Sequence, residues 1–345
     1  MSPAKAKRGG RLHALSLGVL LSALLLAGIV CAVCVGKYRV TPPESLEILF
    51  QQLLGLPDTF PKMTVNVVME LRVPRVFASV LVGAALALSG TAYQGVFSNP
   101  LISPDFLGVS GGACIGAALA ILWSLPSGYI QLFAFAGGVA AVAMTVALPA
   151  ALGNRSNIML VLSGVIVGSA MSSILGFLKY AADPETELAA ITYWTMGGFT
   201  YISLGDLLPT LPVLILPAAG LLLLSWRIDV LSLGEEEARA LGIDVRFVRG
   251  LVILCSTLLT ASSVCIAGTI SWVGLVIPHL GRMLVGPNHT RLLPISALLG
   301  GLFLLAADTL TRTVGAAEMP VSILTGLVGA PFYAWLLWRQ RRRSI

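Results

Sequence analysis

Three arginines stand apart from the other basic residues of this sequence, at positions where their guanidinium groups could bind carboxylates. Arg72 and Arg75 flank a Val-Pro pair in "LRVPRVF", and Arg312 follows Asp308 by four residues, one helical turn, so that an ion pair could hold it. A guanidinium presents a planar fork that binds both oxygens of a carboxylate at once. The alternative is an anchor at a membrane surface, where a long side chain reaches water. From the residues alone both interpretations stay open.

A second charged site is the stretch "LSLGEEEARALGIDV", residues 231–245, which puts three consecutive glutamates and an arginine into a chain with only 11% charged residues. We expect a short helix coated by these charges, with Ala238 and Leu241 facing a partner. Gly242 fits the end of that helix, where a left-handed residue costs glycine little. The stretch predicts a surface that meets a soluble protein, and the alternative is a solvated amphipathic loop.

Other residue types that could do chemistry lack a suitable arrangement. Cys31 and Cys34 form a CxxC pair inside an apolar run, which favours small packing residues over a redox or metal site. The three histidines have no metal-ligand spacing, and no lysine lies in a phosphate-binding Walker A pattern. We therefore expect no metal, no cofactor and no covalent chemistry on this chain, and any ATPase must be a separate chain.

The composition places these sites in a membrane protein. The chain is 57% hydrophobic and 11% charged, against roughly 45–50% and about 25% in soluble domains. Spans of about 20 apolar residues must be helices, since lipid leaves no partner for free backbone groups. We therefore predict an all-α polytopic membrane protein with about ten transmembrane helices, forming a single domain over residues 1–345. The predicted spans are 12–36, 71–95, 106–124, 127–150, 157–180, 206–226, 247–268, 271–285, 292–313 and 321–338.

Two segments depart from this regular pattern. The eighth run is short and is interrupted at "VIPHLGR", which favours a broken or tilted helix. Residues 182–205 are too polar at their start and too rich in glycine to span, so we expect an interfacial helix and a loop.

Lysine and arginine placement predicts the orientation. With the N-terminus in the cytoplasm, most of the 22 basic residues lie on the cytoplasmic side and both termini are inside. Arg72, Arg75 and Arg312 then face the outer surface, and segment 228–246 faces the cytoplasm. The net charge of +6 is a topology signal and no evidence for nucleic acid.

The two halves of the chain show a weak internal similarity. In "SGTAYQGVFSNPL" and "AGTISWVGLVIPHL", Gly90 and Pro100 have the same spacing as Gly268 and Pro278, with another glycine between them in each case. The first copy lies on an inward-running span and the second on an outward-running span. This predicts an inverted repeat, an arrangement common in transporters, although recurrence by chance is the alternative.

Several long motifs together resemble one family. "LRVPRVFASVLVGAALALSGTAYQGVFSNPLISPDFLGVSGG", "LSLGEEEARALGIDV", "GTISWVGLVIPHLGRMLVG" and "AADTLTRTVGAAEMPVSILTGLVGAPFYAWLL" are similar to the FecCD family, the permease subunits of bacterial ABC importers for iron siderophores, haem and vitamin B12. The resemblance runs from about residue 70 to the end. It implies a type II ABC importer permease in the bacterial inner membrane, paired with a second permease subunit as a homodimer or heterodimer.

The resemblance also implies partners and residue roles. Two cytoplasmic ATPase subunits would receive the acidic segment as coupling helices, and a periplasmic or lipoprotein binding protein would deliver the ligand. Arg72, Arg75 and Arg312 match arginines that receive glutamates of the binding protein, and Ser156 and Asn157 are the closest matches to a cytoplasmic gate. The predicted coupling residues are Glu235, Glu236, Ala238, Arg239, Leu241 and Gly242.

These observations predict a permease that works by alternating access and is no enzyme itself. The resemblance also favours an iron-siderophore complex as the substrate, mainly because siderophore members are common in that family. No His, Cys or Tyr arrangement in the sequence suits axial haem ligation or direct iron binding. Haem and cobalamin are the alternatives. Few ionisable side chains occur at membrane depth, which disfavours the rival class of ion-gradient-driven secondary transporters.

Overall fold

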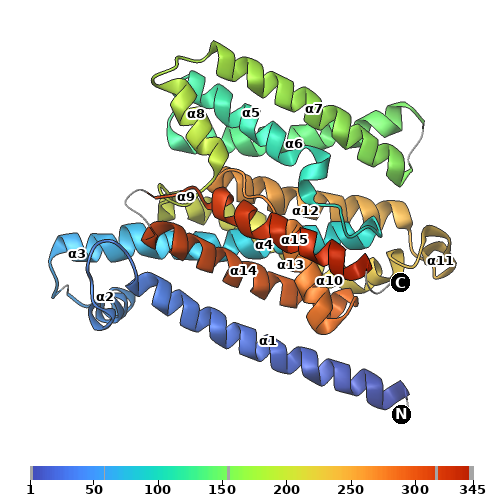
Figure 1. Cartoon of the computed structure of the whole chain (residues 1–345), viewed down its shortest axis with the longest axis horizontal. Helices are drawn as coiled ribbons and strands as arrows, with labels where there is room; N and C mark the ends of the chain where they lie inside the picture. The colour runs from blue at the N-terminus through green and yellow to red at the C-terminus, as the bar shows by residue number, and fades with distance from the viewer. Residues whose placement is uncertain (1–2, 58, 154–155, 315–317, 342–345) are drawn as a thin grey trace.

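The computed structural model describes residues 3–57, 59–153, 156–314 and 318–341, and over these ranges the chain is a bundle of helices without β-strands (Figure 1). Seven helical stretches are long and apolar enough to cross a membrane, and three shorter helices are also apolar. Together these helices provide one helix for each of the ten predicted spans, and the predicted all-α architecture is confirmed. The ten are α1 (Pro3–Cys34), α4 (Val73–Val96), α5 (Val109–Leu122), α6 (Ser127–Ala151), α7 (Asn157–Ala181), α10 (Leu211–Leu231), α12 (Val245–Ala267), α13 (Val273–Val285), α14 (His289–Thr313) and α15 (Val321–Arg341).

Short elements connect these helices and gather at the two ends of the bundle. They are α2 (Pro42–Leu54), α3 (Lys62–Asn66), the π-helical segment η1 (Val67–Arg72), the 3-10 turn η2 (Pro104–Leu107), α8 (Glu187–Met196), α9 (Leu204–Leu207), the 3-10 turn η3 (Leu208–Thr210) and α11 (Glu235–Ala240). In Figure 1, α2, α3, α8 and α9 lie at one end, and α11 lies at the other together with both ends of the chain. We call these the outer end and the α11 end.

The two halves of the bundle repeat one pattern of helix lengths and contacts. Helices α4, α5 and α6 have 24, 14 and 25 residues, and α12, α13 and α14 have 23, 13 and 25. The first helix of each triplet packs against the third helix of the other triplet: α4 packs on α14, and α12 packs on α6. The two first helices, α4 and α12, also pack against each other. Because α4 starts at the outer end and α12 at the α11 end, the halves are inverted, as predicted.

The motifs that suggested this repeat do not fold alike. Gly90 lies inside α4, whereas Gly268 caps the end of α12 with φ +65° and the residues that follow it are not helical. The similarity between these motifs therefore does not align the repeat. The glycines serve a close approach instead: a Cβ on Gly90 would lie 1.9 Å from the carbonyl oxygen of Gly274, so α4 and α13 pack backbone against backbone.

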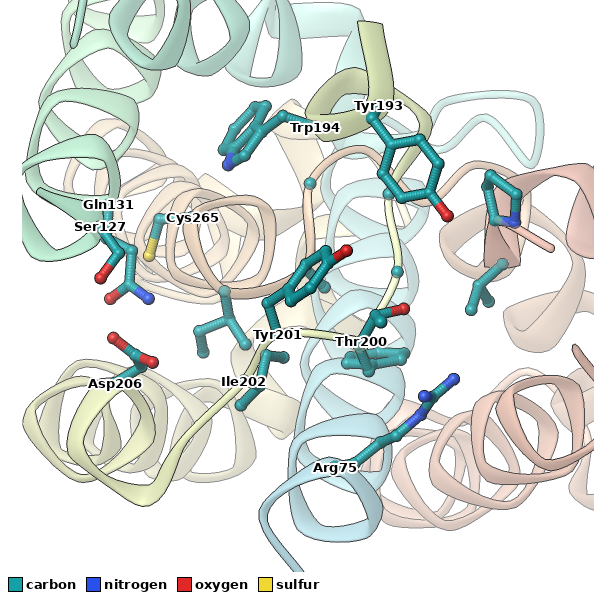
Figure 2. Close-up of a pocket in the computed structure, with 18 of the residues that line it drawn as sticks. Arg75, Ser127, Gln131, Tyr193, Trp194, Thr200, Tyr201, Ile202, Asp206 and Cys265 are labelled. Carbon is teal, nitrogen blue, oxygen red and sulfur yellow. The ribbon is translucent and has the colours of Figure 1, made fainter. Parts of the chain in front are cut away.

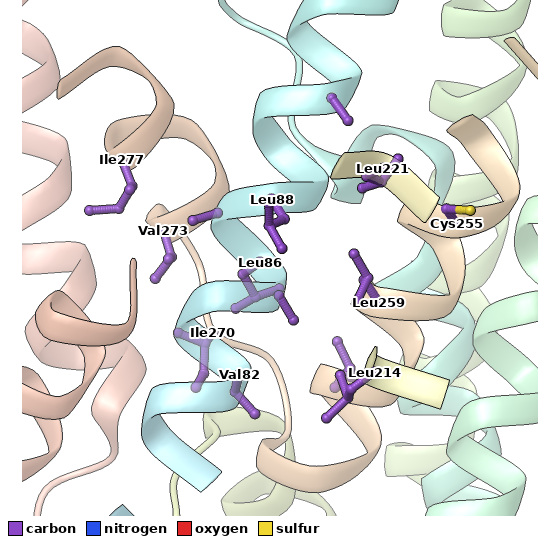
Figure 3. Close-up of a cluster of buried hydrophobic side chains, with 14 of the residues drawn as sticks. Val82, Leu86, Leu88, Leu214, Leu221, Cys255, Leu259, Ile270, Val273 and Ile277 are labelled. Atoms are coloured by element: carbon purple, nitrogen blue, oxygen red, sulfur yellow. The ribbon is translucent and has the colours of Figure 1, made fainter. Parts of the chain in front are cut away.

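The core lies around α4, α10, α12 and α13. Figure 3 shows Val82, Leu86 and Leu88 of α4 packed between side chains of α10 and α12 on one side and of α13 on the other. Both α4 and α12 are buried over most of their length, unlike α7 and α10. In the single chain α4 and α12 are thus central, whereas α7 and α10 expose apolar surface.

The break expected at "VIPHLGR" is absent, because α13 is continuous from Val273 to Val285 with Pro278 inside it. A proline leaves the carbonyl four residues earlier without its helical donor. Here that carbonyl belongs to Gly274, and it accepts a hydrogen bond from the Gln94 amide of α4 at 3.4 Å. The irregular stretch lies before α13, at residues 268–272, where Trp272 has φ +75°.

Helix α2 was missed by the sequence analysis, although its ends carry clear signals. Thr41 and Glu44 form a capping box at the start of α2, and Gly55 ends the helix in the left-handed conformation.

For residues 182–205 the prediction of a helix followed by a loop is confirmed by α8 and the turns after it.

Candidate functional site

Two of the three outer arginines hold the end of α1. Arg72 donates from Nη1 to the carbonyls of Val33 and Cys34 at 2.9 and 3.1 Å, and from Nη2 to that of Tyr38 at 2.5 Å. Arg312 donates from Nη2 to the carbonyl of Ala32 at 2.5 Å. The last carbonyls of a helix have no intrahelical donor, and here the guanidinium groups serve as those donors.

The third arginine joins two acidic residues. Arg75 Nε lies 2.9 Å from Asp308 Oδ1, and Arg75 Nη1 lies 2.8 Å from Glu318 Oε2. The expected pair between Asp308 and Arg312 is present but looser, at 3.9 Å. Asp308 is fully buried, so its charge is balanced mainly by Arg75 of α4.

Glu318 links this cluster to the loop after α8. Its Oε2 also accepts a hydrogen bond from the Thr200 hydroxyl at 3.0 Å. Partial burial alone would raise the pKa of Glu318, but the hydrogen bond and charge of Arg75 outweigh it and hold that pKa below its ordinary value. Glu318 is therefore ionised at neutral pH and connects α4 with the segment around Thr200.

The structure places the outer arginines deeper than the sequence analysis expected. Arg72, Arg75 and Arg312 are 5%, 8% and 5% exposed in the single chain, instead of presenting open guanidinium groups. Apart from the pair of Arg312 with Asp308, their partners could not be read from the sequence, since the carbonyls of α1 lie far from Arg72 and Arg312 along the chain and Glu318 lies far from Arg75. Docking of a partner through these residues stays a prediction.

A small cavity of about 160 Å³ opens beside this cluster at the outer end (Figure 2). Arg75, Thr200 and Asp206 bring polar groups to its wall, and Tyr193, Trp194 and Tyr201 bring aromatic rings. Two backbone segments pack closely in the wall of this cavity, because a Cβ on Gly268 would lie 2.3 Å from the Trp194 carbonyl oxygen. Gly197 and Gly268 both have positive φ. The "GG" in "TMGGFT" was the available signal for this turn.

At the α11 end, one cavity of about 660 Å³ brings together residues that were predicted separately. Ser156 and Asn157, the predicted gate, line it with Glu235 and Arg239 of the predicted coupling segment. Ser156 caps α7, whose first residue is Asn157, by accepting a hydrogen bond from the Met159 amide at 3.3 Å. Asn154 and Arg155 of the same loop lie outside the described residues. The remaining walls come from α6, α12 and Leu160 of α7.

Charged contacts fix α11 on α12 in this region. Glu235 accepts from Arg249 of α12 at 2.5 Å and from Arg239 at 3.1 Å. The hydrogen bond from Arg249 lowers the pKa of Glu235, so this carboxylate is ionised at neutral pH. The ion pair between Glu235 and Arg249 therefore joins α11 to the first turns of α12.

Some of the predicted coupling residues are buried in this chain, and others are exposed. Ala238 is fully buried in the core of its own chain, so it faces α10 and α12 instead of a partner. Leu241 is 60% exposed in the single chain, and Glu236 is also exposed; contact of Leu241 with a partner stays a prediction. Gly242 has φ +77° and its N–H bonds to the Arg239 carbonyl, which confirms a helix end there. Leu233 and Phe247 add exposed apolar surface that the sequence analysis did not single out.

Comparison with known proteins decides the family. The model of the FecCD transport family matches residues 24–339. The chain belongs to this family. It is 38% identical to the molybdate import system permease protein MolB of Haemophilus influenzae, over 93% of this chain and 95% of that protein. It is 40% identical to a probable iron chelatin transport system permease protein of Helicobacter pylori, over 80% of this chain and 83% of that protein.

A solved structure of the same architecture supports this assignment. It is an inward-facing conformation of a metal-chelate type ABC transporter, with a TM-score of 0.84 and 36% sequence identity. The match covers 94% of this chain and 99% of that one. The resemblance stated from the sequence motifs is thus confirmed, and this FecCD chain shares its fold with a transporter subunit over almost its full length.

Proposed function

We propose that this FecCD chain is the transmembrane permease subunit of an ATP-driven importer in the bacterial inner membrane. The observation that carries the proposal is the match to permeases over nearly the whole chain, with identity of 36–40% to the proteins compared. The chain is a transport component, and ATP is hydrolysed by a separate subunit. The α11 end faces the cytoplasm, since both termini and most basic residues belong to it.

The ATPase binds at α11 and the residues around it. Leu233, Leu241 and Phe247 expose apolar side chains beside Glu236 and Glu237, a combination that fits a protein partner better than lipid or water alone. Ala238 and the Glu235–Arg249 pair seat α11 on α12. Ser156 and Asn157 line the same cavity as Glu235, so the proposed gate lies next to the proposed ATPase contact.

The binding protein docks at the outer end, and a second permease subunit completes the pathway. Support for the docking site is the concentration of three arginines within one cluster, although each is mostly engaged inside the chain. Support for a second subunit is the exposed face of α7, where Gly168 and Gly176 have open space around them.

The proposed substrate is an iron-siderophore complex, supported by the iron chelatin permease of Helicobacter pylori and the metal-chelate type transporter. Haem and cobalamin stay as alternatives from the sequence motifs. Molybdate is the second candidate, because the relative MolB matches this chain over 95% of its own length. The permease fold is compatible with each of these, so the binding protein selects among them.

One experiment tests both levels of the proposal. The binding protein that co-purifies with the chain is titrated with a ferric siderophore, haem, cobalamin and molybdate, and uptake into vesicles is measured with ATP inside or with an ion gradient alone. We expect tight binding of the ferric siderophore and uptake that needs ATP. Tight binding of another ligand would replace the substrate and leave the importer intact. Uptake driven by the gradient without ATP would assign the chain to secondary transporters.

A further inference from the structure

Helix α2 at the outer end turns its apolar side chains away from the protein. Leu46, Phe50 and Leu53 are exposed, Leu53 to 84%, and their spacing of four and three residues puts them on one face of the helix. We call these three residues the outer face of α2. Two of the three buried residues of this helix are polar: Ser45, Ile48 and Gln51. The helix is therefore amphipathic, with its apolar side directed outward.

The contacts of the opposite side fix this orientation. Gln51 Nε2 donates to Thr59 Oγ1 at 2.9 Å and to Glu47 Oε1 at 3.1 Å. Ile48 is fully buried in a cluster that includes Val33 of α1 and Val68 of η1. Turning α2 about its axis would expose Ile48 and break the bonds of Gln51. The outer face consequently cannot be hidden inside this chain.

The position of α2 corresponds to the surface of a bilayer. It packs on the end of α1 and on η1, and Figure 1 shows it beside the C-terminal part of α1 at the edge of the bundle. The apolar stretch of α1, Leu12–Cys34, has 23 residues. At 1.5 Å per residue it is about 34 Å long, against roughly 30 Å for a hydrocarbon core and about 40–45 Å with the headgroups. The end of α1 therefore lies where acyl chains meet headgroups, and α2 lies beside it.

A lipid surface fits the outer face better than a protein does. Residues 41–57 contain Glu44 and Glu47 and no basic residue, so they would repel a partner that brings carboxylates to the nearby arginines. The outer face also offers no side-chain hydrogen-bonding group. Lipid is already close, because only 17% of the most apolar window of α1 is buried in the bundle. Amphipathic helices at a membrane surface bury their apolar face about 5–10 Å into the boundary between headgroups and acyl chains.

We propose that α2 is an interfacial helix that lies in the bilayer surface at the outer end, with Leu46, Phe50 and Leu53 inserted between the headgroups and the acyl chains. Because Ile48 packs in the same cluster as the last turn of α1, this insertion fixes the depth of α1 in the membrane. Only the identification of this leaflet as the periplasmic one rests on the proposed function.

The test measures what surrounds the outer face in the full-length chain. The chain, with any subunits that accompany it, is placed in nanodiscs of phosphatidylcholine and phosphatidylglycerol, and Cys31→Ser and Cys34→Ser remove the two cysteines that are not buried. A nitroxide is attached at Phe50→Cys or at Leu53→Cys. Electron paramagnetic resonance then measures its collision rates with oxygen, which concentrates among acyl chains, and with a water-soluble nickel chelate.

Two reference positions calibrate the ratio of oxygen to nickel collisions. Glu185→Cys lies in the exposed turn before α8, also at the outer end, and reports water. Leu24→Cys is exposed within the apolar stretch of α1 and reports hydrocarbon. We expect the ratio at Phe50→Cys and Leu53→Cys to exceed that at Glu185→Cys several-fold and to approach that at Leu24→Cys.

The other outcomes would overturn the proposal. A ratio equal to that at Glu185→Cys would place the outer face in water. Low collision rates with both reagents would mean that protein covers it: the binding protein if protection appears only when that protein is added, and a neighbouring subunit if protection is present from the start. None of these measurements needs ATP or uptake, so failure of the proposed function is recognised separately.

Discussion

Arg75 and Asp308 form an ion pair of 2.9 Å between α4 and α14, and the carboxylate of Asp308 has no exposed surface. The two residues are 233 positions apart in the sequence. A buried charge that loses its partner is costly, because neither water nor another group can replace the interaction. This pair therefore controls how the outer ends of the two helices stay together.

The first prediction concerns this pair. Asp308→Asn should destabilise the chain by about 3–5 kcal/mol, since it leaves Arg75 and Arg312 without their shared buried carboxylate. Unfolding of the purified protein in detergent, followed by intrinsic fluorescence, measures the effect. Asp206→Asn at the same end, on a carboxylate that only caps a short helix, is the control and should cost much less. A fully stable Asp308→Asn variant would show that the pair contributes nothing net.

The second prediction is the pH dependence of the Glu318 contacts. The pKa of Glu318 is lowered in the folded chain, so its contribution to stability is present above the unfolded pKa of about 4.5 and is lost as the pH falls through the folded value. Wild type should melt above Glu318→Gln at pH 7, and the difference should shrink to nothing in acid below pH 4.5. A difference that is constant with pH would mean that the carboxylate charge is not involved.

The third prediction concerns the contact between α11 and the ATPase. Leu241→Glu should prevent co-purification of the ATPase or uncouple its hydrolysis from transport, because it puts a charge into the apolar part of the proposed interface. Gly242→Arg should act similarly and also strain a backbone with φ +77°. Leu56→Glu at the outer end, where Leu56 is 48% exposed, serves as the control. Normal coupling in both α11 variants would place the ATPase elsewhere.

The fourth prediction compares two helical glycines. Gly90→Ala should destabilise the chain by about 1–3 kcal/mol or more, because its Cβ would lie 1.9 Å from the Gly274 carbonyl oxygen and must push α4 and α13 apart. At Gly250 of α12 an added Cβ would meet no atom within 4 Å, so Gly250→Ala should gain up to about 1 kcal/mol from helix propensity. Equal melting temperatures of the two variants would contradict the close packing of α4 on α13.

The fifth prediction concerns docking of the binding protein. Its affinity should fall as salt rises, because exposed charges are screened over about 8–10 Å. Reversing all three arginines would place new carboxylates next to Asp308 and Glu318, so the milder Arg72→Gln and Arg312→Gln variants are used, after their melting temperatures confirm folding. We expect weaker association in both. Affinity that depends neither on salt nor on these residues would leave the arginines with their internal role alone.

The sequence predicted the ten apolar helices well, because each of them is a continuous apolar run bounded by polar residues. It could not predict the partners of Arg72 and Arg75, since these lie 34 to 243 positions away. The burial of Ala238 was likewise hidden, because it depends on how α10 and α12 meet. Helix α2 could have been predicted from the sequence, because Thr41, Glu44 and Gly55 mark its ends through local interactions only.

The contact between Arg312 and the Ala32 carbonyl also sets an order of events during synthesis. The two residues are 280 positions apart. At about 5–20 residues per second, a ribosome takes on the order of ten seconds to a minute between them. Over that interval the newly inserted first helix can be held at its outer end by Arg72 alone. Assembly of this region is therefore completed late, when the ninth span enters the bilayer.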